Sequence, residues 1–143
     1  MQEKDLVLVG TNRGLISAFT LSEAILRWQY SVNDEVRSTP SFHQGHIVLG
    51  TDGGKVYCFD TEGRMKWMQD IGGAIRSQPL IREGVIYITA YNSKLTAIEL
   101  STGNVITRYP SESRIYSSPL FHGGRFYFGT NGGYFHCVEV VSD

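Results

Sequence analysis

Residues 50–67 read GTDGGKVYCFDTEGRMKW, which is a glycine-rich turn, a short apolar stretch, an acidic turn and the start of another apolar stretch. Glycine allows the positive φ angles of tight turns between paired strands, while Val, Tyr and Phe favour strands. Two such turns enclose an apolar stretch of only a few residues. The sequence here therefore predicts antiparallel hairpins built from short strands.

An internal repeat of about 40 residues extends this pattern over the whole chain. The glycine-rich turn recurs, with its first residues 40, 39 and 40 positions apart, at residues 10–14, 50–54, 89–93 and 129–133. A second marker, in which Ser precedes Pro by two residues, recurs at 37–40, 76–79 and 116–119. Both markers share one period, and they divide the chain into repeats at about 1–37, 38–76, 77–116 and 117–143.

The residues between these markers predict four strands in each complete repeat. In the repeat that starts at residue 77, we expect strands at 77–82, 85–90, 94–100 and 105–109. Four antiparallel strands in about 40 residues are typical of a β-propeller blade. We therefore expect an all-β fold, with one propeller domain over 1–143 that contains about four blades. Counted in order, the first blade lacks its first strand and the last blade lacks its fourth.

The repeat resembles that of the PQQ-like (pyrroloquinoline quinone type) β-propeller family. That pattern has a Gly-Thr-x-Asp-Gly turn, an Asp before a Thr-Gly turn, and a Trp after it. The residues that match it best are Gly50, Thr51, Asp52, Gly53, Asp60, Gly63 and Trp67. The resemblance covers nearly the whole chain, and it implies a ring of blades around a central channel.

Some repeats depart from the family pattern. Ala24 stands at the turn glycine of the first repeat, and Thr107 stands where the third repeat should have Trp. Cys58 and Cys137 occupy a position that is Ala in the other two repeats. Because Ala is small and apolar, we expect both cysteines to be buried packing residues.

Most of the recurring residues have a structural explanation. Tryptophan offers a large flat surface for docking one blade on the next, and the glycines allow tight turns. The expected blade-docking residues are Trp28, Trp67, Gly50, Gly53, Gly63, Gly103 and Gly129.

Propellers of this family are closed rings, often of roughly eight blades. An open stack of four would leave an apolar blade face exposed at each end. Two solutions remain open at this point. Two copies could pair head to tail as a homodimer, or the chain could be part of a longer protein.

Charge and hydropathy exclude some classes of partner. Thirteen Lys and Arg residues against 14 Asp and Glu give a formal charge of -1, which does not suit nucleic acid. No apolar run approaches the roughly 20 residues of a membrane span. The acidic start does not resemble a signal peptide. The sequence therefore assigns no compartment.

One rim of the propeller is the expected ligand site, because the loops between second and third strands meet the connections between blades there. Arginine at this rim could bind a carboxylate through its planar fork. The candidate ligand-binding residues are Arg37, Arg76, Arg114, Tyr116, Asp52, Asn92 and Asn131, with Asn12 and Tyr91 beside them. The alternative is that Arg37 and Arg76 only pair with acids such as Glu35, or reach solvent.

Two functions compete. The first is a non-catalytic binding, scaffold or sensory module with a protein or ligand partner; we expect no catalytic residue, no metal site and no cofactor. The second, which the family resemblance invites, is a PQQ- and calcium-dependent quinoprotein dehydrogenase of alcohols or sugars. Asp52 would have to be its base. The sequence has no Ser-His-Asp order, HExxH, CxxC or Walker loop, which favours the binding module.

Overall fold

The computed structural model describes residues 5–139, which form 14 strands in four antiparallel sheets. Blade 1 contains β1 (Leu6–Gly10), β2 (Leu15–Thr20) and β3 (Leu26–Ser31). Blade 2 contains β4 (Ser41–His43), β5 (His46–Gly50), β6 (Lys55–Phe59) and β7 (Met65–Asp70). Blade 3 contains β8 (Leu80–Arg82), β9 (Val85–Ala90), β10 (Lys94–Glu99) and β11 (Val105–Pro110). Blade 4 contains β12 (Leu120–His122), β13 (Arg125–Gly129) and β14 (Phe135–Glu139).

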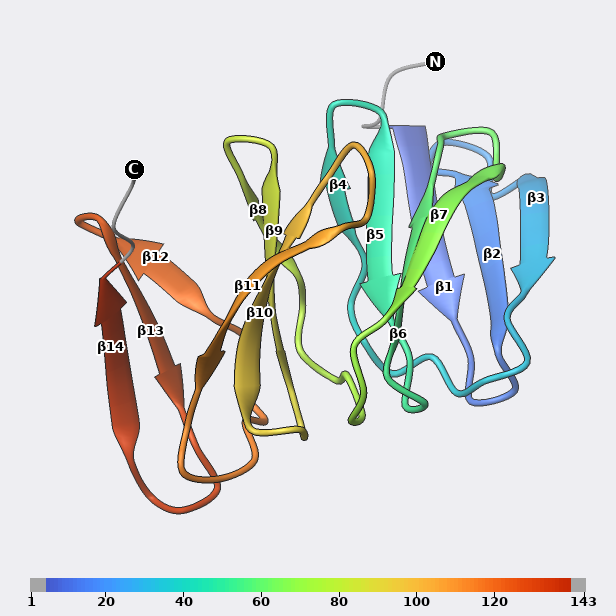
Figure 1. Ribbon diagram of the computed structural model, residues 1–143. Coiled ribbons are helices and arrows are strands. Elements are labelled where there is room, and N and C mark those ends of the chain that lie inside the picture. Colours follow the sequence, from blue (N-terminus) through green and yellow to red (C-terminus); the bar gives the residue numbers. More distant parts are fainter. Residues whose placement is uncertain (1–4, 140–143) are drawn as a thin grey trace.

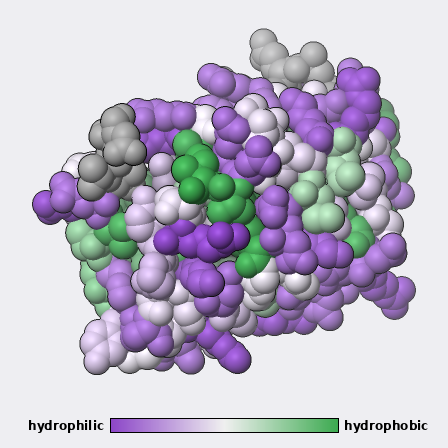
Figure 2. Space-filling view, viewed as in Figure 1, coloured by the Kyte–Doolittle hydropathy of each residue, from purple (hydrophilic) through white to green (hydrophobic). Residues whose placement is uncertain are grey.

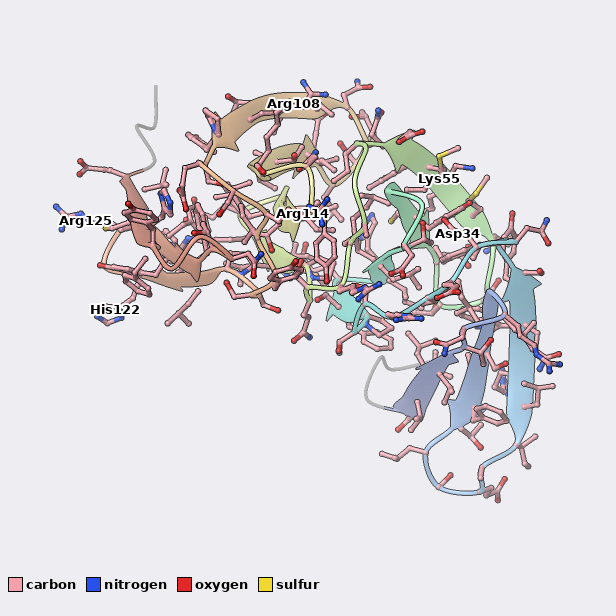
Figure 3. All side chains as sticks on the ribbon, turned by 90° about the horizontal axis from the view of Figure 1, so that it is seen from below. Asp34, Lys55, Arg108, Arg114, His122 and Arg125 are labelled. Carbon is pink, nitrogen blue, oxygen red and sulfur yellow. The ribbon has the colours of Figure 1, made fainter. Side chains whose placement is uncertain are left out.

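The four blades stand side by side and fan out along an open arc (Figure 1; Figure 3). Within each blade every strand pairs with the strand that follows it in the chain, so each sheet is a simple meander. The described part of blade 1 lacks an inner strand, and that of blade 4 lacks an outer strand. The predicted all-β partial propeller is therefore confirmed, including its two incomplete blades.

Strand boundaries agree with the sequence pattern except at the start of blade 3. Three of its four strands lie within one residue of the expected ranges. The predicted strand from Ser77 was too long, because β8 begins only at Leu80. Pro79 has no N–H to donate, and the Ser77 hydroxyl donates instead to the Thr89 carbonyl oxygen. The segment before β8 is therefore held by side-chain bonds and not by strand pairing.

Apolar cores fill the spaces between neighbouring blades. Alternate residues of one strand point to opposite neighbours, so Ile47 and Leu49 pack towards blade 1 while Val48 packs towards blade 3. All three side chains are buried. A third core joins blades 3 and 4 around Leu95 and Phe126. Because blades 2 and 3 each have a neighbour on both faces, their third strands β6 and β10 have long buried runs in place of a polar and apolar alternation.

Each tryptophan lies against a turn of the next blade. The Trp28 indole N–H donates to the Thr61 carbonyl oxygen at 3.0 Å, and that of Trp67 donates to Leu100 at 2.8 Å. A Cβ atom at Gly63 would lie 2.5 Å from the Trp28 ring, and one at Gly103 would lie 2.5 Å from the Trp67 ring. Glycine at these turns therefore makes room for the ring. Both tryptophans are half-buried.

The two cysteines have different environments. A β-bulge recurs in blades 1, 2 and 3 directly after the small residues Ala18, Cys58 and Ala97. Cys58 is buried in the core between blades 2 and 3, and burial raises its pKa to about 11. Cys137 is exposed, so the prediction that it is buried was wrong. It occupies the repeat position of Cys58, whose side chain packs towards the following blade, and no described blade follows blade 4.

Within residues 5–139, no helix has the length and apolar character to cross a membrane.

Candidate functional site

One rim of the arc collects the loops between second and third strands (11–14, 51–54, 91–93 and 130–134) and the connections between blades (32–40, 71–79 and 111–119). We call it the loop rim. It lies at the bottom of Figure 1 and faces the viewer in Figure 3. The opposite rim carries the remaining hairpin turns. The loop rim is the region in which the sequence places its candidate ligand-binding residues.

The backbone of the loop rim is held by the same hydrogen bond at every junction. A loop N–H donates to a carbonyl oxygen of the preceding connection: Asp52 to Glu35 (2.9 Å), Tyr91 to Ala74 (3.0 Å) and Asn131 to Arg114 (2.8 Å). The residue after each acceptor donates in turn to the preceding blade, as Ile75 does to Thr51 at 3.0 Å. Each connection is thus tied to the blades on both of its sides, which gives the rim side chains a rigid base.

Hydroxyl groups tie a connection to the next connection or to a neighbouring strand on the inner side of the arc. The Ser38 hydroxyl donates to the Ser77 carbonyl oxygen at 2.8 Å, and the Thr89 hydroxyl donates to the Ser117 carbonyl oxygen at 2.6 Å. Ser38 and Ser77 are buried. The sequence analysis used this serine as a repeat marker but gave it no structural role. Its recurrence at the repeat spacing was the signal that pointed to one.

Asp52 lies between two arginines. Its carboxylate accepts from both Nε and Nη2 of Arg76, at 3.2 and 2.9 Å, and lies 3.6 Å from Arg37 Nε. Arg37 also pairs with Glu35 at 2.7 Å. The hydrogen bond to Asp52 raises the pKa of Arg76. The ion pairs that the sequence offered as the alternative to ligand binding are therefore present, although about 40% of each arginine side chain remains exposed.

Aromatic side chains continue this line of contacts into blade 3 and the connection that follows it. The Arg76 guanidinium lies over the Tyr91 ring, 5.1 Å from its centroid. Tyr91 meets Tyr116 edge to face at 4.3 Å. We call the continuous series Glu35, Arg37, Asp52, Arg76, Tyr91 and Tyr116 the rim ladder. It joins residues of the first three repeats, because each member touches the next across a blade junction or within one connection.

The remaining candidate residues lie on the same rim but outside the ladder. The Asn92 side chain is used to hold the backbone, since its amide donates to the Ile71 carbonyl oxygen of the preceding connection and its oxygen accepts from the Lys94 N–H. Asn131 and Asn12 are both near loop tips, and Asn131 is held through its backbone. Arg114 is exposed, makes none of the ion pairs found in residues 5–139, and lies near the middle of the arc (Figure 3).

A cluster around Glu112 was missed by the sequence interpretation. Its carboxylate accepts from the Thr130 hydroxyl and lies 2.5 Å from His136 Nε2. The Thr130 hydrogen bond, together with those from His136 and Ser113, lowers the pKa of Glu112 to about 2. Glu112 has no counterpart in the other repeats, where Asn33 and Gly72 stand, so the repeat offered no signal for it.

The donor set does not fit a calcium and PQQ site. Calcium needs six to eight oxygen ligands, usually with several carboxylates. Residues 5–139 contain no group of three His, Cys, Asp or Glu side chains that could hold a metal ion. Asp52 is the candidate base, and two guanidinium groups already contact its carboxylate. Within residues 5–139, the loop rim therefore lacks the group of oxygen ligands that the calcium and PQQ site of a quinoprotein dehydrogenase would need.

A hollow of about 280 Å³ lies behind the ladder, on the inner side of the arc. It is lined by Ser41, Phe42, Gln78, Pro79, Leu80, Ile81, Ser118 and Pro119. These residues belong to the inner strands and to the Ser-x-Pro markers. The hollow is open to solvent, so it suits part of an extended chain better than a buried cofactor.

Comparison with known proteins assigns the family. The profile of the family described as "Outer membrane protein assembly factor BamB" matches residues 12–140. The chain belongs to this family. Similar curated relatives are the outer membrane protein assembly factors BamB of Moranella endobia, 24% identical over 93% of this chain, and of Shewanella oneidensis, 30% identical over 71% of it. The chain spans 37% and 30% of their respective lengths.

Solved structures show the same fold. BamB from Moraxella catarrhalis superposes with a TM-score of 0.85 at 16% identity, over 94% of this chain and 43% of that one. The computationally designed Ika4 protein gives 0.86 at 16% identity, over 98% and 88%. A quinohemoprotein alcohol dehydrogenase from Pseudomonas putida gives 0.77 at 14% identity, over 87% and 27%. The family profile and the curated relatives thus support an assembly-factor relationship, whereas the dehydrogenase shares the fold.

Proposed function

We propose that this protein is a non-catalytic binding module that holds a polypeptide partner across the rim ladder. The observation that carries the proposal is the continuous series of contacts from Glu35 to Tyr116. Its members alternate in charge in the first two repeats and are aromatic in the third. Tyr and Arg are, with Trp, the residues enriched at the energetic centres of protein interfaces.

The chemistry of the ladder suits a peptide segment better than a small anion. Each arginine already has a carboxylate partner, so a free anion would have to compete with Glu35 or Asp52. A polypeptide can instead bring its own acids and bases in the opposite order and stack apolar side chains on Tyr116, which is exposed. Because the ion pairs are preformed, little side-chain entropy is lost on binding.

The relatives support a protein partner. They are named outer membrane protein assembly factors, and a factor in assembly must contact other proteins. We infer that the partner is a protein of such an assembly process. No PQQ or calcium is needed for this role. Addition of both should leave the melting temperature of the protein unchanged, and a rise would favour the dehydrogenase alternative.

The ring around the rim ladder must be completed by further blades. Either a second copy in a homodimer or the remainder of a longer chain could supply them. In both cases the ladder would lie on the loop rim of a closed propeller, because its residues belong to the loops of blades 2 and 3 and to the connections between blades.

Site-specific photo-crosslinking tests the partner proposal. A photoreactive phenylalanine replaces Tyr116 on the loop rim or, as the matched control, Arg108 on the outer strand β11 (Figure 3). In an extract containing the envelope proteins, position 116 should give one discrete crosslinked polypeptide that position 108 does not give. Arg76→Glu should abolish that crosslink. Equal or absent crosslinking at the two positions would overturn the proposal.

A further inference from the structure

The two ends of the arc present opposite halves of one type of interface. Val7 and Val9 of β1 occupy the repeat positions that hold Ile47 and Leu49 in blade 2. Blade 1 covers Ile47 and Leu49. Ile47 and Leu49 are 0% exposed, whereas Val7 and Val9 are 40% and 45% exposed. Phe19 lies on the same face, paired with Val7 across the sheet. Blade 1 therefore carries the apolar face that a preceding blade should cover.

Blade 4 carries the complementary face. Phe135 and Cys137 occupy the repeat positions of Val56 and Cys58, which are buried against blade 3. Phe135 is 75% exposed, and Leu120 beside Tyr127 is 65% exposed. Tyr127 and Phe135 stack with their centroids 5.9 Å apart. Apolar side chains accordingly line the left margin of the surface, along β14 (Figure 2).

We propose that a second copy of this chain covers both faces, blade 4 of each copy packing on blade 1 of the other. Such a head-to-tail joint is heterologous. Two identical joints close a ring of roughly eight blades with twofold symmetry, so no free face remains. The proposal concerns how the ring is completed and does not depend on a partner at the rim ladder.

Side-chain size favours a second copy over an arbitrary blade. Phe135 occupies the repeat position that holds Ile16, Val56 and Leu95 in the other blades, and it is the largest of these four residues. Across each joint this position faces a position of the following blade, as Ile16 faces Tyr57. That second position holds Tyr57, Thr96 and His136 in blades 2 to 4, and the smallest residue, Ser17, in blade 1. A large residue opposite a small one keeps the core volume of the joint close to that of the internal joints.

The turn of blade 1 also fits a neighbour without tryptophan. Gly63 and Gly103 are turn residues with positive φ whose missing Cβ makes room for a docked Trp. Ala24 occupies the corresponding turn, also with positive φ, but it has a Cβ. A Trp docked as in the internal joints would collide with that atom. Blade 4 of a second copy brings no Trp, since the sequence holds only Trp28 and Trp67.

The oligomeric state of designed charge variants tests this joint. The wild-type chain should have a mass near twice 16.0 kDa by light scattering during size exclusion. Val9→Lys on one end face and Phe135→Glu on the other should each give the mass of a single copy. A mixture of the two variants should recover the double mass, because one joint then has two native faces and the other pairs Lys with Glu.

Two controls make the test specific. Ile106→Lys replaces an apolar residue whose exposure, 55%, lies between those of Val9 and Phe135; it is on the outer strand β11, away from both end faces, and should leave the double mass unchanged. Alkylation of Cys137 in the wild-type protein should slow as protein concentration rises, because the joint covers it. A single-copy mass for the wild type would overturn the proposal. So would a dimer that tolerates Val9→Lys, one lost in Ile106→Lys, or a mixture that stays monomeric.

Discussion

Blades 2 and 4 carry nearly the same turn and strand, yet their side chains have opposite surroundings. Gly50 to Cys58 and Gly129 to Cys137 align residue by residue. In blade 2, Val56 and Cys58 are fully buried, while in blade 4 the aligned Phe135 and Cys137 are exposed. The repeat determines which face of the sheet a residue occupies, whereas the neighbouring blade determines whether that face is buried. Aligned substitutions in the two blades should therefore differ in their effect on stability.

The largest expected effect is loss of a docked tryptophan. Trp67→Ala removes the ring that lies against Gly103 and the hydrogen bond to Leu100. Because Trp67 is half-buried, the free energy of unfolding should fall by about 3 kcal/mol, the lower end for core aromatic truncations. Urea denaturation measures it. Met68→Ala, on the same strand but 43% exposed, should cost much less, and equal costs would contradict the docking role.

A glycine-to-alanine pair compares the two blades directly. At Gly50 an added Cβ would lie 2.2 Å from Ile75 Cγ2, so Gly50→Ala should lower the free energy of unfolding by about 2 kcal/mol through overpacking. At Gly129 the nearest atom within reach is the Tyr134 carbonyl oxygen at 4.0 Å, so Gly129→Ala should change stability little. Similar losses at both sites in the isolated single-copy form would refute the difference between covered and free faces.

The cysteine pair tests burial chemically. Cys58→Ser places a hydroxyl in an apolar core and should cost about 1 kcal/mol, whereas Cys137→Ser should be close to neutral. Burial raises the pKa of the Cys58 thiol to about 11, so it stays protonated at neutral pH. Iodoacetamide should therefore label Cys137 and spare Cys58 in the native single-copy form, as mass spectrometry would show. Rapid labelling of Cys58 would contradict its packing.

The smallest expected effect is a change in how stability depends on acidic pH, through Glu112 at the junction of blades 3 and 4. Hydrogen bonds from Thr130 and its neighbours lower the pKa of Glu112 from 4.5 to about 2 in the folded protein. A lowered folded pKa means that the carboxylate contributes stability above pH 4.5, and that this contribution is lost as pH falls towards 2. Glu112→Gln should therefore show a smaller loss of stability across this window than the wild type. Glu83→Gln on the opposite rim is the matched control, and an unchanged profile for Glu112→Gln would contradict the assignment.

The loop rim was partly predictable from the sequence. Arg37, Arg76 and Tyr116 share one repeat position, and Asp52 and Tyr91 share another, so their common rim followed from the strand count. Their order of contact did not follow, because it depends on which connection lies beside which loop across a blade junction. The Glu112 cluster could not be found at all, since it joins side chains 18 and 24 residues apart without any repeated pattern.

The sequence by itself determined the period, the strand order and the two incomplete blades of this protein, because turn glycines and short β-branched or aromatic runs act locally along the chain. Only the tertiary structure decided that Cys58 is buried and Cys137 exposed, that Asp52 lies between two arginines, and that the turn glycine which Ala24 replaces faces a Trp ring in blades 2 and 3. These features arise between blades. Residues about 40 positions apart are in contact there, and no local pattern of hydrophobicity predicts which of them will be covered by the next blade.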